Sequence, residues 1–361
     1  MEFPELNITL DTIYRSQGTP LTCIVRQNHQ KLFHYEAGEQ KLELCNLYSI
    51  TKVFTCVLAM QLWEQGMFCL NDPLCRYIPG FDERIRIEDL FCMASGLDYE
   101  YSTPELDALR CETGGRMPTL PSITYLGRKP LLFAPGTHWK YGLSHDVLGG
   151  VIVALSESSL EQTMRRQLLD PLGLAQTSFD RSPTRCAHMS TQYMLLETGE
   201  KCTVEGNAFV FGTEYESGGA GLLSSAEDCS VFADALACGG VGENGRRILR
   251  SETIDKMRRN RLSDVQLQDL RELRQFLLYG YGLGVRTMLK PRADGPDSPI
   301  GEIGWGGAAG AYMLVDPQNR LSMYVGMHLL QTSEEERHPL YRHALYKDFS
   351  VLANERALSY T

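Results

Sequence analysis

The stretch LYSITK, residues 47–52, opens a long run of regularly spaced apolar residues and places a serine and a lysine three positions apart. If residues 49–65 form a helix, Ser49 and Lys52 lie on one face, so the lysine amine can reach the serine hydroxyl. The spacing therefore predicts a serine nucleophile that carries its own base.

The residues after this motif predict a helix packed into a core. The apolar positions at helical spacing are Val53, Cys56, Val57, Met60 and Trp63. Burial on such a face disfavours a charged amine, and a neutral lysine can take the serine proton. A serine at the helix start also lies where free backbone N–H groups and the helix dipole favour an oxyanion.

The Ser-x-x-Lys pattern is short, and most occurrences are a capping serine beside a solvated lysine. In this chain it occurs once, and no Gly-x-Ser-x-Gly elbow offers another nucleophile. The hypothesis of a catalytic serine therefore depends on partner motifs elsewhere in the chain.

Composition excludes several classes of protein. The 361 residues are 43% hydrophobic and 22% charged, as in ordinary soluble globular proteins. A net charge of −10 disfavours nucleic acids and anionic membranes as partners. The chain starts without a basic and apolar leader, and its eleven cysteines form no Cys-x-x-Cys pair. We expect a cytoplasmic protein with neither a membrane nor a nucleic-acid partner.

Strands are expected near both ends of the chain. The predicted elements are hairpins at 21–35 and 311–328, and helices at 5–17 and 335–357. This pattern favours an α+β fold, in which residues 1–71 and 271–361 build an antiparallel β-sheet flanked by helices. Residues 72–270 would form an inserted, mainly helical domain.

Two insertions in the middle of the chain, 99–130 and 258–279, are loop-like. The second carries Leu270, Leu273 and Leu277 at helical spacing. Each insertion is a candidate lid or subunit contact, although a helix packed on the core is the more ordinary outcome.

A second motif surrounds Tyr141. It lies between a Pro-Gly turn at 135–136 and an apolar helical run at 147–152, so it should sit on a loop at a helix start. A phenol near a lysine can relay a proton between a nucleophile and a leaving group. The alternative is that Tyr141 only packs.

A third motif, GWGGA at residues 304–308, leads into the second hairpin. Glycines in a strand mark close backbone approach, as expected where a main-chain N–H points at a substrate carbonyl. A bulge at a sheet edge would also explain them.

In this order and at these separations, the three motifs resemble those of the serine β-lactamase and penicillin-binding-protein superfamily, in its class C-like branch, which includes esterases. The resemblance covers about residues 20–330. Further matching segments are 66–74, 78–79, 87–90, 95–97, 135–136, 171–174 and 217–225.

The resemblance implies the β-lactamase/transpeptidase-like fold and a set of roles. Ser49 would be the nucleophile, Lys52 its base partner and Tyr141 the tyrosine of the Tyr-x-Asn motif. The backbone N–H groups of Ser49 and Ala308 would form the oxyanion hole. No cofactor is implied, and no His, Cys, Asp and Glu cluster has the spacing of metal ligands.

Two departures from the lactamase pattern concern substrate binding. Leu143 stands where that pattern has Asn, and Trp305, Gly306 and Gly307 replace Lys-Thr-Gly. Both changes remove groups that grip penicillins and D-Ala-D-Ala peptides. The chain resembles the carboxylesterases of the superfamily instead, so we expect these four residues to bind substrate and Leu143 and Trp305 to line an apolar acyl pocket.

The leading hypothesis is a serine hydrolase that cleaves small-molecule carboxylic esters, or amides, through an acyl-enzyme. A β-lactamase, D-amino-acid peptidase or acyltransferase is an alternative. The first two need a carboxylate anchor, for which Arg110, Arg116 and Arg286 are candidates. A binding or sensor protein that is acylated once without turnover is a further alternative.

Four other residues flank the motifs, namely His138, His145, Asp146 and Glu302. The histidines could tune Tyr141, although a loop histidine more often packs or lies on the surface. The two acids are expected only to orient loops.

Overall fold

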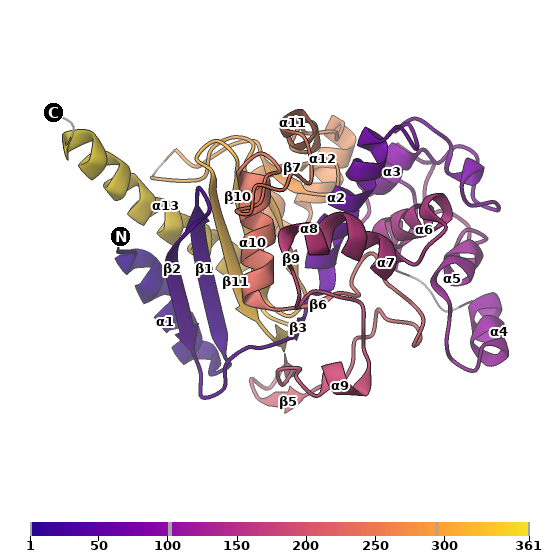
Figure 1. The fold of residues 1–361 in the computed structure, drawn as a ribbon, viewed down its shortest axis with the longest axis horizontal. Helices are drawn as coiled ribbons and strands as arrows, with labels where there is room; N and C mark the ends of the chain where they lie inside the picture. Colours follow the sequence, from indigo (N-terminus) through magenta and orange to yellow (C-terminus); the bar gives the residue numbers. More distant parts are fainter. Residues whose placement is uncertain (1, 100–102, 294, 360–361) are drawn as a thin grey trace.

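The computed structural model, which describes residues 2–99, 103–293 and 295–359, is built around a seven-stranded sheet (Figure 1). All its strand pairs are antiparallel, in the order β2-β1-β11-β10-β9-β8-β7. The strands are β1 (Leu21–Gln27), β2 (Gln30–Ala37), β7 (Tyr279–Tyr281), β8 (Arg286–Met288), β9 (Ile303–Gly307), β10 (Ala311–Asp316) and β11 (Leu321–Met327). The predicted α+β class is therefore confirmed.

Both predicted hairpins are confirmed. Between β1 and β2, Asn28 and His29 have φ values of 48° and 68°, which suits a tight turn whose twist matches the strands. The N-terminal strand then joins the C-terminal hairpin, with Leu21 opposite Met327. The sequence pattern did not predict β7 and β8, which are three residues long each.

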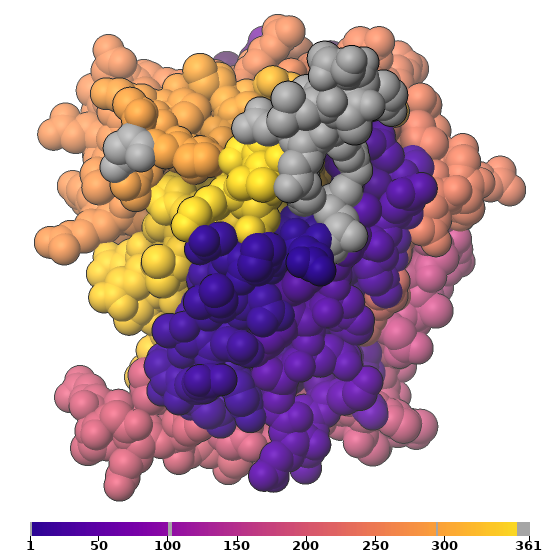
Figure 2. Space-filling model, turned by 90° about the vertical axis from the view of Figure 1, so that its left-hand side faces the viewer, coloured from indigo at the N-terminus to yellow at the C-terminus, as the bar shows by residue number. Residues whose placement is uncertain are grey.

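One face of the sheet is covered by the two ends of the chain. Helices α1 (Pro4–Gln17) and α13 (Glu334–Ser359) pack on each other and share a core with β1, β10 and β11. Figure 2 shows these N-terminal and C-terminal segments side by side on one surface. The Asp348 carboxylate accepts the Leu6 N–H at 2.9 Å, which joins the helices across the whole length of the sequence.

The opposite face carries α10 (Ala226–Ala237), which packs against β1, β10 and β11. Next to it lies α2 (Thr51–Glu64), whose Phe54 ring stacks on Phe232 at a centroid distance of 3.8 Å. Every residue of α2 from Thr51 to Leu62 is buried. The sequence predicted one buried apolar face, whereas this helix is surrounded by protein on all sides.

Apart from a short turn just before α2, the remaining helices of the described chain lie between residues 74 and 276, and the chain also forms two small sheets. They are η2 (Leu74–Arg76), α3 (Ile87–Phe91), α4 (Pro104–Glu112), α5 (Thr119–Leu126), α6 (Ser144–Ser156), α7 (Leu160–Met164), η3 (Arg165–Leu169), α8 (Asp170–Leu172), α9 (Pro183–Cys186), α11 (Ser251–Met257), α12 (Asp264–Arg271) and η4 (Arg274–Phe276). The small sheets hold β3 (Cys45–Asn46) with β6 (Leu223–Ser224), and β12 (Leu329–Leu330) with β4 (Tyr193–Leu195) and β5 (Lys201–Thr203). The division into a sheet domain and an inserted domain stays a prediction.

The two predicted insertions fold as helices. The first contains α4 and α5, while its residues 100–102 lie outside the described chain. In the second, α12 ends at Arg271, so the three leucines do not form one helical face: Leu270 is buried, whereas Leu273 and Leu277 are 39% and 57% exposed. Across the described helices, none combines the length and the apolar character that crossing a membrane requires.

Candidate active site

Ser49 lies in a single 3-10 turn, η1 (Tyr48–Ile50), that leads directly into α2. The expected helix therefore begins at Thr51, two residues later than predicted. Tyr48 has a φ of 47°, an uncommon value for a side chain of this size, so the chain turns sharply just before the serine. The Tyr48 hydroxyl donates to Gln192 Oε1 at 2.9 Å, which anchors this turn.

Lys52 is fully buried and donates three hydrogen bonds. Its Nζ lies 3.2 Å from Ser49 Oγ, 3.1 Å from Tyr99 Oη and 2.7 Å from the Gly219 carbonyl oxygen. The structure thus brings the two side chains of the Ser-x-x-Lys motif into contact, as their spacing on one turn predicted.

A glycine separates Lys52 from a buried carboxylate. A Cβ atom built on Gly219 would lie 2.2 Å from Asp146 Oδ2 and 3.5 Å from Lys52 Nζ. Asp146 Oδ1 accepts hydrogen bonds from Ser217 Oγ at 2.6 Å and Tyr215 Oη at 3.1 Å. Burial raises the pKa of Asp146, while the Lys52 charge and these hydrogen bonds oppose that rise. Asp146, expected only to orient a loop, is therefore part of the lysine's electrostatic environment.

Tyr141 faces Lys52 with its ring. The Lys52 Nζ lies 4.8 Å from the ring centroid, within the range of a cation–π contact. The Tyr141 hydroxyl oxygen accepts a hydrogen bond from Trp305 Nε1 at 3.0 Å. Two of the three sequence motifs therefore meet directly, through a phenol and an indole.

Tyr99 is a residue of this site that the sequence analysis missed. Its hydroxyl contacts Lys52, and its ring lies edge to face against Tyr141 at 5.6 Å. Burial, and after it the neighbouring Tyr141 and Asp146, raise the pKa of Tyr99. The only sequence signal was its position two residues after the matched segment 95–97.

The end of β9 lies against the turn that carries the serine. A Cβ atom on Gly307 would lie 2.5 Å from the Leu47 carbonyl oxygen and 3.4 Å from Ile50 Cγ1, so only glycine allows this approach. Ala308 follows at once, in the turn after the strand. In contrast, a Cβ on Gly306 would meet His338 of α13 at 2.6 Å, so that position faces the terminal helix.

The two predicted walls of the acyl pocket are both almost fully buried. Trp305 is 4% exposed and stacks on Phe276 at a centroid distance of 5.0 Å. Leu143 is 3% exposed and lines a separate small cavity with Leu97 and Leu126. Leu143 is thus packed in the hydrophobic core, and its role in substrate binding stays a prediction.

The other flanking residues have structural partners. The His138 ring contacts Asp269 of α12 at 3.0 Å. His145 is fully buried, with Nε2 3.2 Å from the Phe91 carbonyl oxygen, and burial, reinforced by the Lys52 charge, lowers its pKa to about 3. It is therefore neutral at ordinary pH.

Glu302 lies in a buried polar network behind β9. Its carboxylate accepts from Arg286 Nη2 at 2.8 Å and from Tyr279 Oη at 3.0 Å. Arg286, a candidate carboxylate anchor, also donates to the Met313 carbonyl oxygen at 3.1 Å. Its guanidinium is thus committed to supporting the sheet.

Away from these motifs, the fold brings together three residue types that ligate metals. His29, Asp234 and Cys238 place their ligand atoms within 4.8 Å of one another. The His29 Nδ1 to Asp234 Oδ2 distance of 2.7 Å is that of a hydrogen bond between the β1–β2 turn and α10. This pair explains the cluster as an attachment of the hairpin to the helix.

Comparison with known proteins identifies the class. The beta-lactamase family model matches residues 23–347, so the chain belongs to the beta-lactamase family. This assignment agrees with the superfamily that the three motifs resemble.

Three relatives illustrate the range of similarity. Protein Rv1367c of Mycobacterium tuberculosis is 28% identical over 304 residues, covering 77% of this chain and 75% of the relative. Esterase EstB of Burkholderia gladioli is 26% identical over 332 residues, covering 83% and 81%. The solved structure of EstCE1, described as a hydrolase with promiscuous acyltransferase activity, superposes with a TM-score of 0.78 at 21% identity, covering 95% and 98%. The fold is therefore shared with esterase-type members of the superfamily.

Proposed function

We propose that this protein is a serine hydrolase that cleaves small-molecule carboxylic esters through an acyl-enzyme on Ser49. The observation that carries the proposal is the 3.2 Å contact between Ser49 Oγ and the amine of Lys52, which is buried. A nucleophile within hydrogen-bond reach of a base is the arrangement that activates a serine. The match to an esterase, EstB, along most of both chains supports the choice of ester as substrate.

In the first half-reaction, the Ser49 oxygen bonds to the carbonyl carbon while its proton passes to the Lys52 amine in its neutral form. The carbonyl oxygen becomes an oxyanion. It is held by the backbone N–H groups of Ser49 and Ala308, which the approach of β9 to the serine turn would bring to the same side. The tetrahedral intermediate then breaks its bond to the alcohol oxygen, which takes a proton from a neighbouring phenol, and the Lys52 ammonium returns its proton to that phenol.

In the second half-reaction, water attacks the acyl-enzyme, the ester bond to Ser49 breaks and the carboxylic acid is released. If an alcohol attacks instead, the same intermediate gives acyl transfer. EstCE1, which shares this fold, is a hydrolase that also has acyltransferase activity. We therefore propose acyl transfer as a second activity of the same acyl-enzyme, favoured when acceptor alcohol is abundant.

A β-lactamase or D-peptidase activity is less favoured by the residues present. The Asn and Lys that would grip such substrates are replaced by Leu143 and Trp305, and both replacements are buried. Arg286, which could have replaced the lost anchor, is held by Glu302. These features support ester over lactam or D-peptide as the substrate class.

The test is steady-state hydrolysis of p-nitrophenyl butyrate by the wild-type protein and by Ser49→Ala. We expect a loss of at least about 10³-fold in kcat, because the variant lacks the nucleophile. Ser251→Ala, which alters an exposed serine at the start of α11, is the matched control and should hydrolyse at the wild-type rate. Equal rates for wild type and Ser49→Ala would contradict the proposal, as would a single burst without further turnover.

A further inference from the structure

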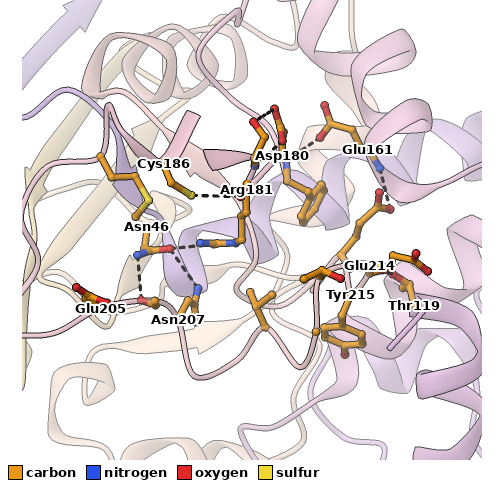
Figure 3. Close-up of a pocket in the computed structure, with 18 of the residues that line it drawn as sticks. Asn46, Thr119, Glu161, Asp180, Arg181, Cys186, Glu205, Asn207, Glu214 and Tyr215 are labelled. Atoms are coloured by element: carbon orange, nitrogen blue, oxygen red, sulfur yellow. Dashed lines mark hydrogen bonds between the residues drawn. The ribbon is translucent and has the colours of Figure 1, made fainter. Parts of the chain in front are cut away.

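A large cavity lies beside the candidate active site and does not include it. It has a volume of about 1490 Å³, and Figure 3 shows its polar lining. Asn46 and Tyr215 line it, whereas Ser49, Lys52 and Tyr141 do not. A space of this size, separate from the nucleophile, calls for an occupant of its own.

Arg181 is the cation that faces this cavity without a counter-charge. Its Nη2 donates to Asn46 Oδ1 and to the Gly221 carbonyl oxygen, both at 2.9 Å and both neutral acceptors. Among the described residues, no carboxylate comes within 4 Å of its guanidinium, and no acceptor is found for its Nε or Nη1. The Nε and Nη1 donors of the guanidinium are thus left for a ligand.

The carboxylates that line the cavity are mostly engaged elsewhere. Glu161 is bound by Arg165 at 2.8 Å, and Glu214 by Arg116 at 3.2 Å. Glu216 accepts the Glu161 N–H at 3.1 Å, and Asp180 accepts the N–H and hydroxyl of Ser182. Glu205, the fifth, is exposed. None of them neutralises Arg181, which Figure 3 shows grouped with Asn46 and Asn207 on one side of the cavity.

The rest of the wall offers apolar surface. Its apolar members include Pro118, Leu120, Val153, Phe179 and Val210. A guanidinium at one side and apolar side chains along another part of the wall match a molecule with one anionic end and a hydrocarbon body.

We infer that this cavity binds an amphipathic carboxylate, with the carboxylate on Arg181 and the hydrocarbon body against the apolar wall. A charge-assisted hydrogen bond from Nε or Nη1 to a carboxylate oxygen is the interaction that a partly buried guanidinium with unused donors makes best. Binding does not depend on the proposed esterase activity, although an amphipathic carboxylate is also what hydrolysis of a medium-chain ester releases.

The cavity and the lysine share one loop. Three successive carbonyl oxygens are held by side chains: Gly219 by Lys52 at 2.7 Å, Ala220 by Asn207 at 2.8 Å and Gly221 by Arg181 at 2.9 Å. A carboxylate that draws Arg181 away from Gly221 therefore alters the segment that also positions the Lys52 amine. Occupancy of the cavity should change turnover at Ser49.

The test is isothermal titration of Ser49→Ala protein, which cannot turn over, with octanoate and with octanamide. Octanamide has the same chain and no charge. We expect octanoate to bind one site at least tenfold more tightly than octanamide. Arg181→Met should abolish that difference, and Val210→Trp, which fills the apolar wall, should weaken both ligands at least tenfold.

The matched control is Arg185→Met, because Arg185 lies four residues away and does not line this cavity. It should bind octanoate as the parent does, and thermal unfolding reports whether each variant is folded. Equal binding of octanoate and octanamide would overturn the inference, and so would unchanged octanoate binding in Arg181→Met or Val210→Trp. If Arg181→Met does not fold, the ligand pair and Val210→Trp still decide the question.

Discussion

Two cations donate to carbonyl oxygens of the loop 217–222, and their surroundings differ. Lys52 meets two hydroxyl groups, of Ser49 and Tyr99, together with one carbonyl oxygen. Among the residues that the structure describes, the Arg181 guanidinium donates to an amide oxygen and a carbonyl oxygen. A lysine can exchange a proton with hydroxyl groups, whereas an arginine stays charged and can only bind. The loop thus contacts one cation that is suited to proton transfer and one that is suited to ligand binding.

The comparison extends to the histidines beside the two cations. His145 lies near Lys52 and His328 near Arg181. Burial, with a contribution from each cation, lowers their pKa values to about 3 and about 4. Both regions therefore keep a neutral imidazole beside a cation, which avoids placing two positive charges together in the interior.

The largest expected effect is on Lys52. Lys52→Met keeps the length of the side chain and removes the amine, so kcat for p-nitrophenyl butyrate should fall about 10³- to 10⁴-fold. Lys201→Met, at an exposed lysine, is the control. If Lys52→Met keeps more than a tenth of the wild-type activity, Lys52 is not the base, and the two cations do not differ in their chemical role.

The second prediction concerns the stability of the neutral histidines against acid. An unfolded histidine titrates near pH 6.5, so below that pH the unfolded chain binds protons that the folded His328 does not bind until about pH 4. His328 therefore makes its full contribution to the free energy of unfolding above pH 6.5, and this contribution is lost as the pH falls. Between pH 6.5 and 5.0, His328→Gln should lose about 2 kcal/mol less than the wild type.

Urea unfolding at the two pH values measures this difference. His188→Gln, at a histidine whose side chain is 68% exposed, should keep the wild-type pH dependence. An unchanged pH dependence in His328→Gln would show that the imidazole beside Arg181 is not held neutral.

The smallest expected change in kcat distinguishes the hydroxyl groups of Tyr99 and Tyr141. Tyr99→Phe removes the hydroxyl that contacts Lys52, whereas Tyr141→Phe removes the one that accepts from Trp305. We expect kcat to fall about 10- to 30-fold in Tyr99→Phe and less in Tyr141→Phe, because the first phenol bonds directly to the base. The pH profile of kcat should also shift in Tyr99→Phe. The reverse order would assign the proton relay to Tyr141, as the family resemblance implies.

Local sequence patterns predicted the parts of this site that depend on local geometry. Ser49 and Lys52 are three residues apart, so a single helical turn decides their contact. The other partners of Lys52 come from far along the chain, Tyr99 at a separation of 47 residues and Gly219 at 167. Such contacts depend on tertiary packing, for which one sequence carries no periodic signal.

The same distinction explains the sheet and the cavity. In the longer strands near both ends of the chain, apolar residues alternate with polar ones or follow one another over enough positions to be recognised. In contrast, β7 and β8 are only three residues long each. Leu143, expected to bind substrate because of its place in a motif, lies just before α6 and packs in the hydrophobic core, so that role stays a prediction. Arg181 belongs to no motif, and only the folded chain shows that no carboxylate of the described residues pairs with it.

The pairing of β1 with β11 has a consequence for biosynthesis. Leu21 finds its partner at Met327, and the Gly307 end of β9 completes the surroundings of Ser49. A ribosome makes the serine early and these partners about 250 to 300 residues later, at roughly 5–20 residues per second. The nascent chain therefore carries Ser49, the proposed nucleophile, for some time before the sheet can close. Contacts this distant in sequence also make for slow folding, so the activity should emerge only after the whole chain has left the ribosome.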